Sequence, residues 1–178
     1  NFDYVSPMGI KHFDGVIGRR RELAPGSQFS KYLSCFWNPI IKIGDWIFCH
    51  GGLNMFIARN FKIEEVNLLM REYLFGNVQL IKHPLFSKFF LNDDSLLWNR
   101  DYSGDNIDTS GLKKALSCYN AKHLVIGHTP QTGGINSKGN GMVWRVDSAM
   151  SNAFGRRQNN DRIQVLAIIR NGANVKII

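Results

Sequence analysis

Cysteine is scarce in this sequence, and long hydrophobic runs are absent from it. The three cysteines, Cys35, Cys49 and Cys118, are odd in number and lack metal-type spacing, which argues against a disulfide framework. No stretch approaches eighteen consecutive apolar residues, and the first residues resemble neither a signal peptide nor a transit peptide. These absences predict reduced thiols, no membrane partner and a cytoplasmic location.

Acidic residues are also few, since 14 Asp and Glu stand against 22 Lys and Arg and give a net charge of +8. Short basic clusters lie at Arg19-Arg20-Arg21 and Arg156-Arg157. Such clusters are compatible with nucleic acid or a phosphorylated partner. The runs are short and no aromatic residues interleave with them, so we do not expect nucleic acid to be a dedicated partner. A non-catalytic basic interaction domain remains an alternative.

The length and patterning predict one α/β domain over residues 1–178 with a mixed sheet, because helical and strand periodicities alternate along the chain. Residues 1–26, rich in Pro and Gly, predict loop with at most one short element. An aromatic stripe of Phe29, Tyr32, Phe36 and Trp37 predicts a helix whose aromatic face lies in the core. The other predicted elements are helices at 62–75, after Pro84 and after an N-cap at Ser110, and strands at 41–43, 46–50, 123–127, 142–146, 163–169 and 173–178.

Two of these predicted strands each deliver a histidine next to glycine. His50 ends one and is followed by Gly51 and Gly52, whose lack of side chains would let backbone approach a metal or phosphate. His128 follows Gly127 at the end of the other. Because imidazole is the commonest protein metal ligand, the pair predicts a shared metal site.

Two histidines are too few for a hydrolytic metal site, which also needs carboxylates. Asp45 and Asp147 are the nearest candidates. Each is equally explained as a turn residue or as a partner that holds a histidine ring. Cys49 adjoins His50, but strand alternation points its thiol to the opposite face.

Arg100 follows an apolar pair and Trp98 in a segment flanked by polar loops. Its guanidinium matches phosphate oxygens in a fork and stays protonated. A surface pairing with Asp101 or Asp94 explains it equally well.

Four strings in this order resemble the C-terminal half of a calcineurin-like metallophosphoesterase of the Shewanella-like phosphoprotein phosphatase branch. They are Phe-Cys-His-Gly-Gly-Leu at 48–53, Leu-Trp-Asn-Arg-Asp-Tyr at 97–102, Val-Ile-Gly-His-Thr-Pro-Gln at 125–131 and Val-Trp-Arg-Val-Asp-Ser-Ala-Met-Ser at 143–151. The resemblance implies two mixed sheets sandwiched between helices and a dinuclear Mn, Fe or Zn centre. It implies that His50 and His128 bind the second metal and that Arg100 holds substrate phosphate.

The family's Gly-Asp-x-His, Gly-Asp-x-x-Asp-Arg-Gly and Gly-Asn-His-Glu motifs are absent from this sequence. In that family they supply the first metal's ligands, the bridging Asp and the general acid. We therefore expect the C-terminal part of a longer phosphomonoester hydrolase that acts on phosphoprotein or phosphopeptide. Alone it would bind at most one weakly held metal and show little turnover. A nucleotide or dinucleoside-polyphosphate hydrolase of the same fold is the nearest alternative.

Overall fold

A five-stranded mixed sheet lies at the centre of the computed structural model, which describes residues 5–150 and 163–178. Its strand order is β1-β2-β3-β5-β4, and β2, β3 and β5 run parallel while β1 and β4 pair antiparallel at the edges. This arrangement brings the C-terminal ends of three strands to one edge, where open α/β sheets place their ligand sites. The strands are β1 (Ile40–Ile43), β2 (Trp46–Cys49), β3 (His123–Ile126), β4 (Asn136–Lys138) and β5 (Val143–Arg145).

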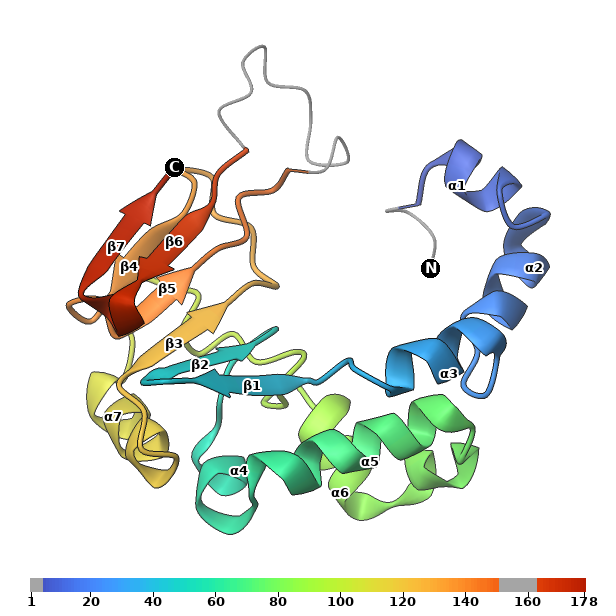
Figure 1. Cartoon of the computed structure of the whole chain (residues 1–178), viewed down its shortest axis with the longest axis horizontal. Helices are drawn as coiled ribbons and strands as arrows, with labels where there is room; N and C mark the ends of the chain where they lie inside the picture. The colour runs from blue at the N-terminus through green and yellow to red at the C-terminus, as the bar shows by residue number, and fades with distance from the viewer. Residues whose placement is uncertain (1–4, 151–162) are drawn as a thin grey trace.

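Helices pack against one face of this sheet and form the hydrophobic core with it (Figure 1). Ile47 and Leu124 project from the strands into this core and are fully buried. Phe86 and Leu112 meet them from the helices. The helices are α4 (Met55–Asn60), α5 (Ile63–Phe75), α6 (Pro84–Phe90) and α7 (Thr109–Cys118), with a 3-10 turn, η1 (Val78–Lys82), between α5 and α6.

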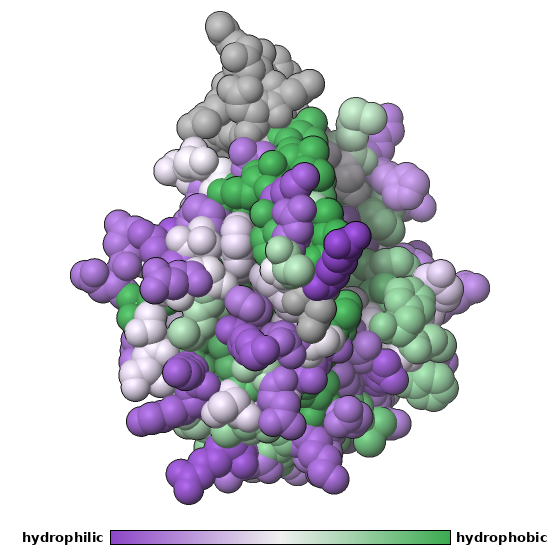
Figure 2. Space-filling model, turned by 60° about the vertical axis from the view of Figure 1, so that its left-hand side comes forward, coloured by the Kyte–Doolittle hydropathy of each residue, from purple (hydrophilic) through white to green (hydrophobic). Residues whose placement is uncertain are grey.

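The opposite face of the sheet is covered at one end by the C-terminal hairpin of β6 (Leu166–Ile169) and β7 (Asn174–Ile177). A 3-10 turn, η3 (Arg170–Gly172), joins them, and a Cβ on Gly172 would stand 2.9 Å from the Trp46 ring. The hairpin thus shields Trp46, which is 2% exposed. The face of the molecule seen from this side has hydrophobic patches among hydrophilic side chains (Figure 2). Ile41 and Ile43 of the edge strand stay exposed on this face.

Three N-terminal helices leave the sheet as an arm that curves beyond α5 (Figure 1). They are α1 (Pro7–Lys11), α2 (Gly15–Glu22) and α3 (Gln28–Ser34). The prediction of loop for 1–26 is therefore wrong over the described residues 5–26. Pro7 occupies the first helical turn, where proline is tolerated, and the Ser6 hydroxyl caps it by accepting from Gly9 N at 3.0 Å.

Helix α3 has the predicted N-cap but not the predicted core face. The Ser27 hydroxyl accepts from Ser30 N at 3.1 Å, which confirms the cap. Tyr32 is 65% exposed and Phe36 is 52% exposed, so the prediction that the aromatic stripe is core was wrong. The helix instead buries Ser30 and Ser34.

The remaining predicted elements appear with small shifts. Helix α5 and the helix opened by Pro84 are confirmed. Helix α7 begins at Thr109 because the Asp108 carboxylate, rather than Ser110, caps it by accepting from Gly111 N at 2.9 Å. The mixed α/β architecture is confirmed, whereas the sandwich of two sheets between helices stays a prediction. No helix in the part of the chain that the structure describes is long and apolar enough to cross a membrane.

Candidate functional site

The two strand-end histidines lie side by side at the carboxyl edge of the sheet. Strands β2 and β3 pair in parallel register, so His50 and His128 follow neighbouring strand ends. The Gly127 amide donates to the His50 carbonyl at 2.8 Å, which links the two loops directly. The imidazole centroids are 5.0 Å apart with an interplanar angle of 63°. Two imidazoles at this separation can converge on one ion.

The backbone at His128 is strained. Its φ is 65°, in the left-handed region that side chains other than glycine rarely adopt. The Thr129 amide donates to the Gly127 carbonyl at 2.7 Å and closes a tight turn around His128. Such a conformation costs about 1–3 kcal/mol and persists where surrounding structure enforces it, characteristically at ligand sites.

Burial and neighbouring cations act together on His128. Desolvation lowers its pKa, the charges of Arg100 and His50 lower it further, and only Asp147 opposes them. The imidazole is therefore held in the neutral form that binds metals. Its Nε2 atom is buried and has no hydrogen-bond partner among the described residues. A buried ring nitrogen left unpaired in this way fits a ligand atom.

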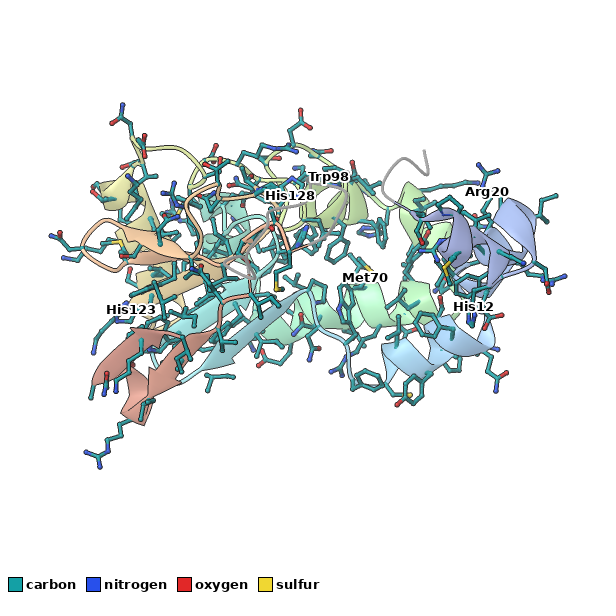
Figure 3. The ribbon with its side chains drawn as sticks, turned by 90° about the horizontal axis from the view of Figure 1, so that it is seen from above. His12, Arg20, Met70, Trp98, His123 and His128 are labelled. Atoms are coloured by element: carbon teal, nitrogen blue, oxygen red, sulfur yellow. The ribbon has the colours of Figure 1, made fainter. Side chains whose placement is uncertain are left out.

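The loop that carries Trp98 and Arg100 docks onto the same edge. The Gly51 amide donates to the Leu96 carbonyl at 2.7 Å. Trp98 then meets His128 edge-on, with ring centroids 5.5 Å apart, and Figure 3 shows the two side chains together. Arg100 is exposed beside them, and its Nη1 donates to the Trp98 carbonyl at 3.5 Å.

Gly51 and Gly52 have a structural role in packing, while the predicted approach of a metal or phosphate stays a prediction. A Cβ on Gly51 would lie 2.9 Å from the backbone nitrogen of Asn99, and one on Gly52 would lie 2.4 Å from the Asn99 Oδ1. The glycines thus admit the Trp98–Arg100 loop against the His50 turn. Among the described residues, the group that approaches these glycines closely is Asn99, through its backbone at Gly51 and its side chain at Gly52.

Of the two candidate carboxylates, only Asp147 lies at this edge. Its backbone carbonyl accepts from Gln131 N at 2.7 Å, and its charge acts on His128. Asp45 occupies the turn before β2, at the far end of the strand from His50, and forms an ion pair with Lys122 at 2.7 Å. The pairing lowers the Asp45 pKa. The turn-residue explanation of Asp45 is correct, and its assignment as a site carboxylate is corrected.

Arg100 forms no ion pair with Asp101 or Asp94. The ion pairs among the described residues join Lys122 to Asp45 and Lys138 to Asp105. Asp101 is held instead by Asn99, whose Nδ2 donates to it at 2.9 Å. Asn99 is 1% exposed, and sequence reasoning missed it. No periodicity in the sequence marked it as buried.

A pocket of about 670 Å³ opens beside the histidines. His50, His128 and Trp98 form one wall, and an apolar wall continues along the face of the sheet opposite the helices. His123 lies away from it at the start of β3, stacked on Trp46 at 4.1 Å (Figure 3). The apolar lining consists of Trp37, Pro39, Ile41, Phe48, Leu97, Val125, Ile126 and Val146.

The donor set fits part of a metal centre. His50 and His128 offer two imidazoles with a converging geometry, and Nε2 of His128 is unpaired. Within residues 5–150 and 163–178, no group of three or more His, Cys, Asp or Glu side chains could hold an ion. A metal ion held by these two imidazoles would therefore need further ligands beyond the described residues.

Comparison with solved structures identifies the fold. The structure of cold-active protein tyrosine phosphatase matches with a TM-score of 0.62 and 24% identity, over 84% of this chain and 44% of that one. The structure of the enzyme from a psychrophilic Shewanella species matches with a TM-score of 0.58 and 25% identity, over 79% and 42%. The fold is that of the corresponding part of these phosphatases.

Sequence comparison places the chain among named relatives, although no family model matches it. Shewanella-like protein phosphatase 1 of Plasmodium berghei is 32% identical over 84% of this chain, and Shewanella-like protein phosphatase 2 of Arabidopsis thaliana is 27% identical over 93%. The chain spans 43% and 41% of their lengths. An uncharacterized protein of Acanthamoeba polyphaga mimivirus is 31% identical over 94% of this chain and 77% of its own length. The chain belongs to the same protein family as that viral protein.

Proposed function

We propose that this chain is the C-terminal part of a metal-dependent phosphomonoester hydrolase that acts on phosphoproteins. The observation that carries the proposal is the convergence of His50, His128 and Arg100 at one edge of the sheet, with the His128 Nε2 buried and unpaired. The named phosphatase relatives support the reaction class. Their greater length supports a parent protein in which further ligands complete the centre.

In this proposal His50 and His128 hold the second of two Mn, Fe or Zn ions. Bound there, a dinuclear centre supplies a hydroxide nucleophile and neutralises charge on the phosphoryl oxygens. The residues of this chain orient and bind. Arg100, exposed at the rim, would donate two N–H hydrogen bonds from its fork to phosphate oxygens and stabilise the charge of the transition state. Trp98 packs edge-on against His128, which fixes the ring and keeps water from one side of it.

The apolar wall of the pocket supports the proposal that a further layer belongs on this face. Ile41 is 40% exposed and Ile43 is 64% exposed at the edge strand β1. Apolar side chains on an open sheet face favour burial by about 25 cal/mol for each Å² covered. The sandwich of two sheets implied by the resemblance would cover them and bring the missing carboxylates toward His50.

The test compares the 178-residue chain with the longer protein that its gene encodes, using an aryl phosphate and Mn²⁺. The chain alone is expected to show little turnover, and the longer protein to be active. In the longer protein, His128→Ala should nearly abolish turnover, and Arg100→Ala should lower kcat/KM by about 10²-fold, as for other transition-state charge contacts. Arg59→Ala, at an exposed position of α4, is the matched control and should leave turnover unchanged.

Three results would count against the assignment. Unchanged turnover in both His128→Ala and Arg100→Ala would remove the site. Hydrolysis of dinucleoside polyphosphates with none of phosphopeptides would favour the alternative substrate class. A longer protein inactive on every phosphoester would favour a basic interaction domain.

A further inference from the structure

The guanidinium of Arg145 is a buried cation that the proposed chemistry does not use. The residue is 6% exposed at the end of β5, and no carboxylate of the described residues lies within ion-pair distance of it. Asp105, on which the charge of Arg145 acts, forms its ion pair with Lys138 at 2.7 Å instead. Burying a charge without a paired carboxylate is unfavourable, so its hydrogen bonds must explain its presence.

One branch of these bonds leads to Arg100. Nη1 of Arg145 donates to the carbonyls of Ser103 at 2.6 Å and Gly104 at 2.8 Å. Ser103 in turn donates twice to the Arg100 carbonyl, from its amide at 3.0 Å and its hydroxyl at 2.7 Å. The backbone that presents Arg100 is therefore tied to β5 through Ser103.

The other branch leads to His128. Nε of Arg145 donates to Asn136 Oδ1 at 2.6 Å, and Asn136 Nδ2 donates to Gln131 Oε1 at 3.2 Å. Gln131 Nε2 then donates to the Thr129 carbonyl at 2.9 Å. Thr129 closes the tight turn around His128. This branch braces the strained backbone from the side of β4.

We propose that Arg145 is a positioning residue that holds the Arg100 loop and the His128 loop in fixed relation to one another. The planar guanidinium suits the task because its N–H donors point in fixed directions and can bond two loops at once. A methionine of similar volume would fill the space without bonding either loop. The inference rests on the proposed function for its consequence, since a metal ligand and a phosphate contact must be kept in register.

The test uses Arg145→Ala, the branch variant Asn136→Ala, and Arg59→Ala as the control for loss of an arginine. Amide hydrogen exchange is followed in residues 98–103, in 127–131, and in the interiors of β2 and β3. Arg145→Ala should speed exchange in both loops and leave the strands unchanged, and millimolar guanidinium should restore protection. Asn136→Ala should loosen 127–131 alone. Arg59→Ala should change neither loop.

Zinc binding provides the second readout. Calorimetry and the imidazole signals of His50 and His128 are followed during titration with Zn²⁺. Arg145→Ala is expected to weaken zinc binding by about 10–100-fold, the usual loss when groups that orient a ligand are removed. If the 178-residue chain binds no zinc at these histidines, the titration is made on the longer protein, which carries the remaining ligands. A longer protein that binds no zinc there would sink the proposed metal site, and the role of Arg145 is then decided by exchange alone. For Arg145→Ala, the inference would be overturned by faster exchange in one loop only, by faster exchange throughout the sheet, or by no change at all. For Asn136→Ala, equal loosening of both loops would overturn it.

Discussion

Gly51→Ala should destabilise the chain through a steric conflict between the His50 turn and the Trp98–Arg100 loop. The added Cβ would stand 2.9 Å from Asn99 N, 3.0 Å from Asn99 O and 3.0 Å from the carbonyl carbon of Leu97. All three are backbone atoms, so no side chain can rotate away. The loop would have to retreat by about half an ångström, which stretches the bond between Gly51 N and the Leu96 carbonyl.

The magnitude follows from these two effects. Overpacking a well-filled site costs about 1–3 kcal/mol, and weakening one buried backbone hydrogen bond costs about 1 kcal/mol. Gly51→Ala should therefore lower the free energy of unfolding by about 2–4 kcal/mol. With a urea m-value of about 2 kcal/mol/M, the unfolding midpoint falls by about 1–2 M.

Gly104→Ala is the matched control. Gly104 lies in the following loop, and a Cβ there would meet nothing within 4 Å. Its substitution should shift stability by less than about 0.5 kcal/mol or raise it slightly through the unfolded state. Equal urea midpoints for Gly51→Ala and Gly104→Ala would refute the steric reasoning.

Two smaller predictions concern buried polar groups. Burial raises the pKa of the Cys49 thiol to about 12. At pH 8 an aromatic disulfide reagent should therefore react with the exposed Cys35 and Cys118 in the native chain, and with Cys49 only in denaturant. Reaction of all three thiols together in the native chain would contradict this. Tyr102→Phe removes the hydroxyl that donates to the Leu53 carbonyl at 2.8 Å. It should lower the free energy of unfolding, measured by urea titration, by about 1–3 kcal/mol. An unchanged urea midpoint would mean that this hydrogen bond does not stabilise the chain.

The sequence predicted the parts of the site whose position follows from strand order. His50 and His128 each end a short apolar strand next to glycine, and parallel pairing of those strands brings the imidazoles together. The pattern did not require knowledge of tertiary packing. Their roles as metal ligands, and that of Arg100 with phosphate, stay predictions.

Other features depend on packing that no local pattern carries. Asp45 and His50 are close in sequence, but an extended strand advances about 3.3 Å per residue and separates them. Arg145 lies in the predicted strand 142–146, where no periodicity marks it as buried, yet it is buried and bonded to a loop remote in sequence. The stripe of aromatic residues on α3 has helical spacing, but the face that packs on α5 is the one with Ser30 and Ser34. The cluster at Arg156-Arg157 lies outside the described residues.

The parallel pairing of β2 with β3 also limits the stage of synthesis at which the two histidines can come together. Trp46 aligns with His123, and α4, α5, α6 and α7 all lie between them in the chain. Contacts between distant segments carry a large loop-closure entropy and form slowly. During synthesis His50 leaves the ribosome before His128, so the first imidazole is present before the second one has been made. The histidine pair therefore cannot form until synthesis has reached His128, by which point all four of these helices have been made.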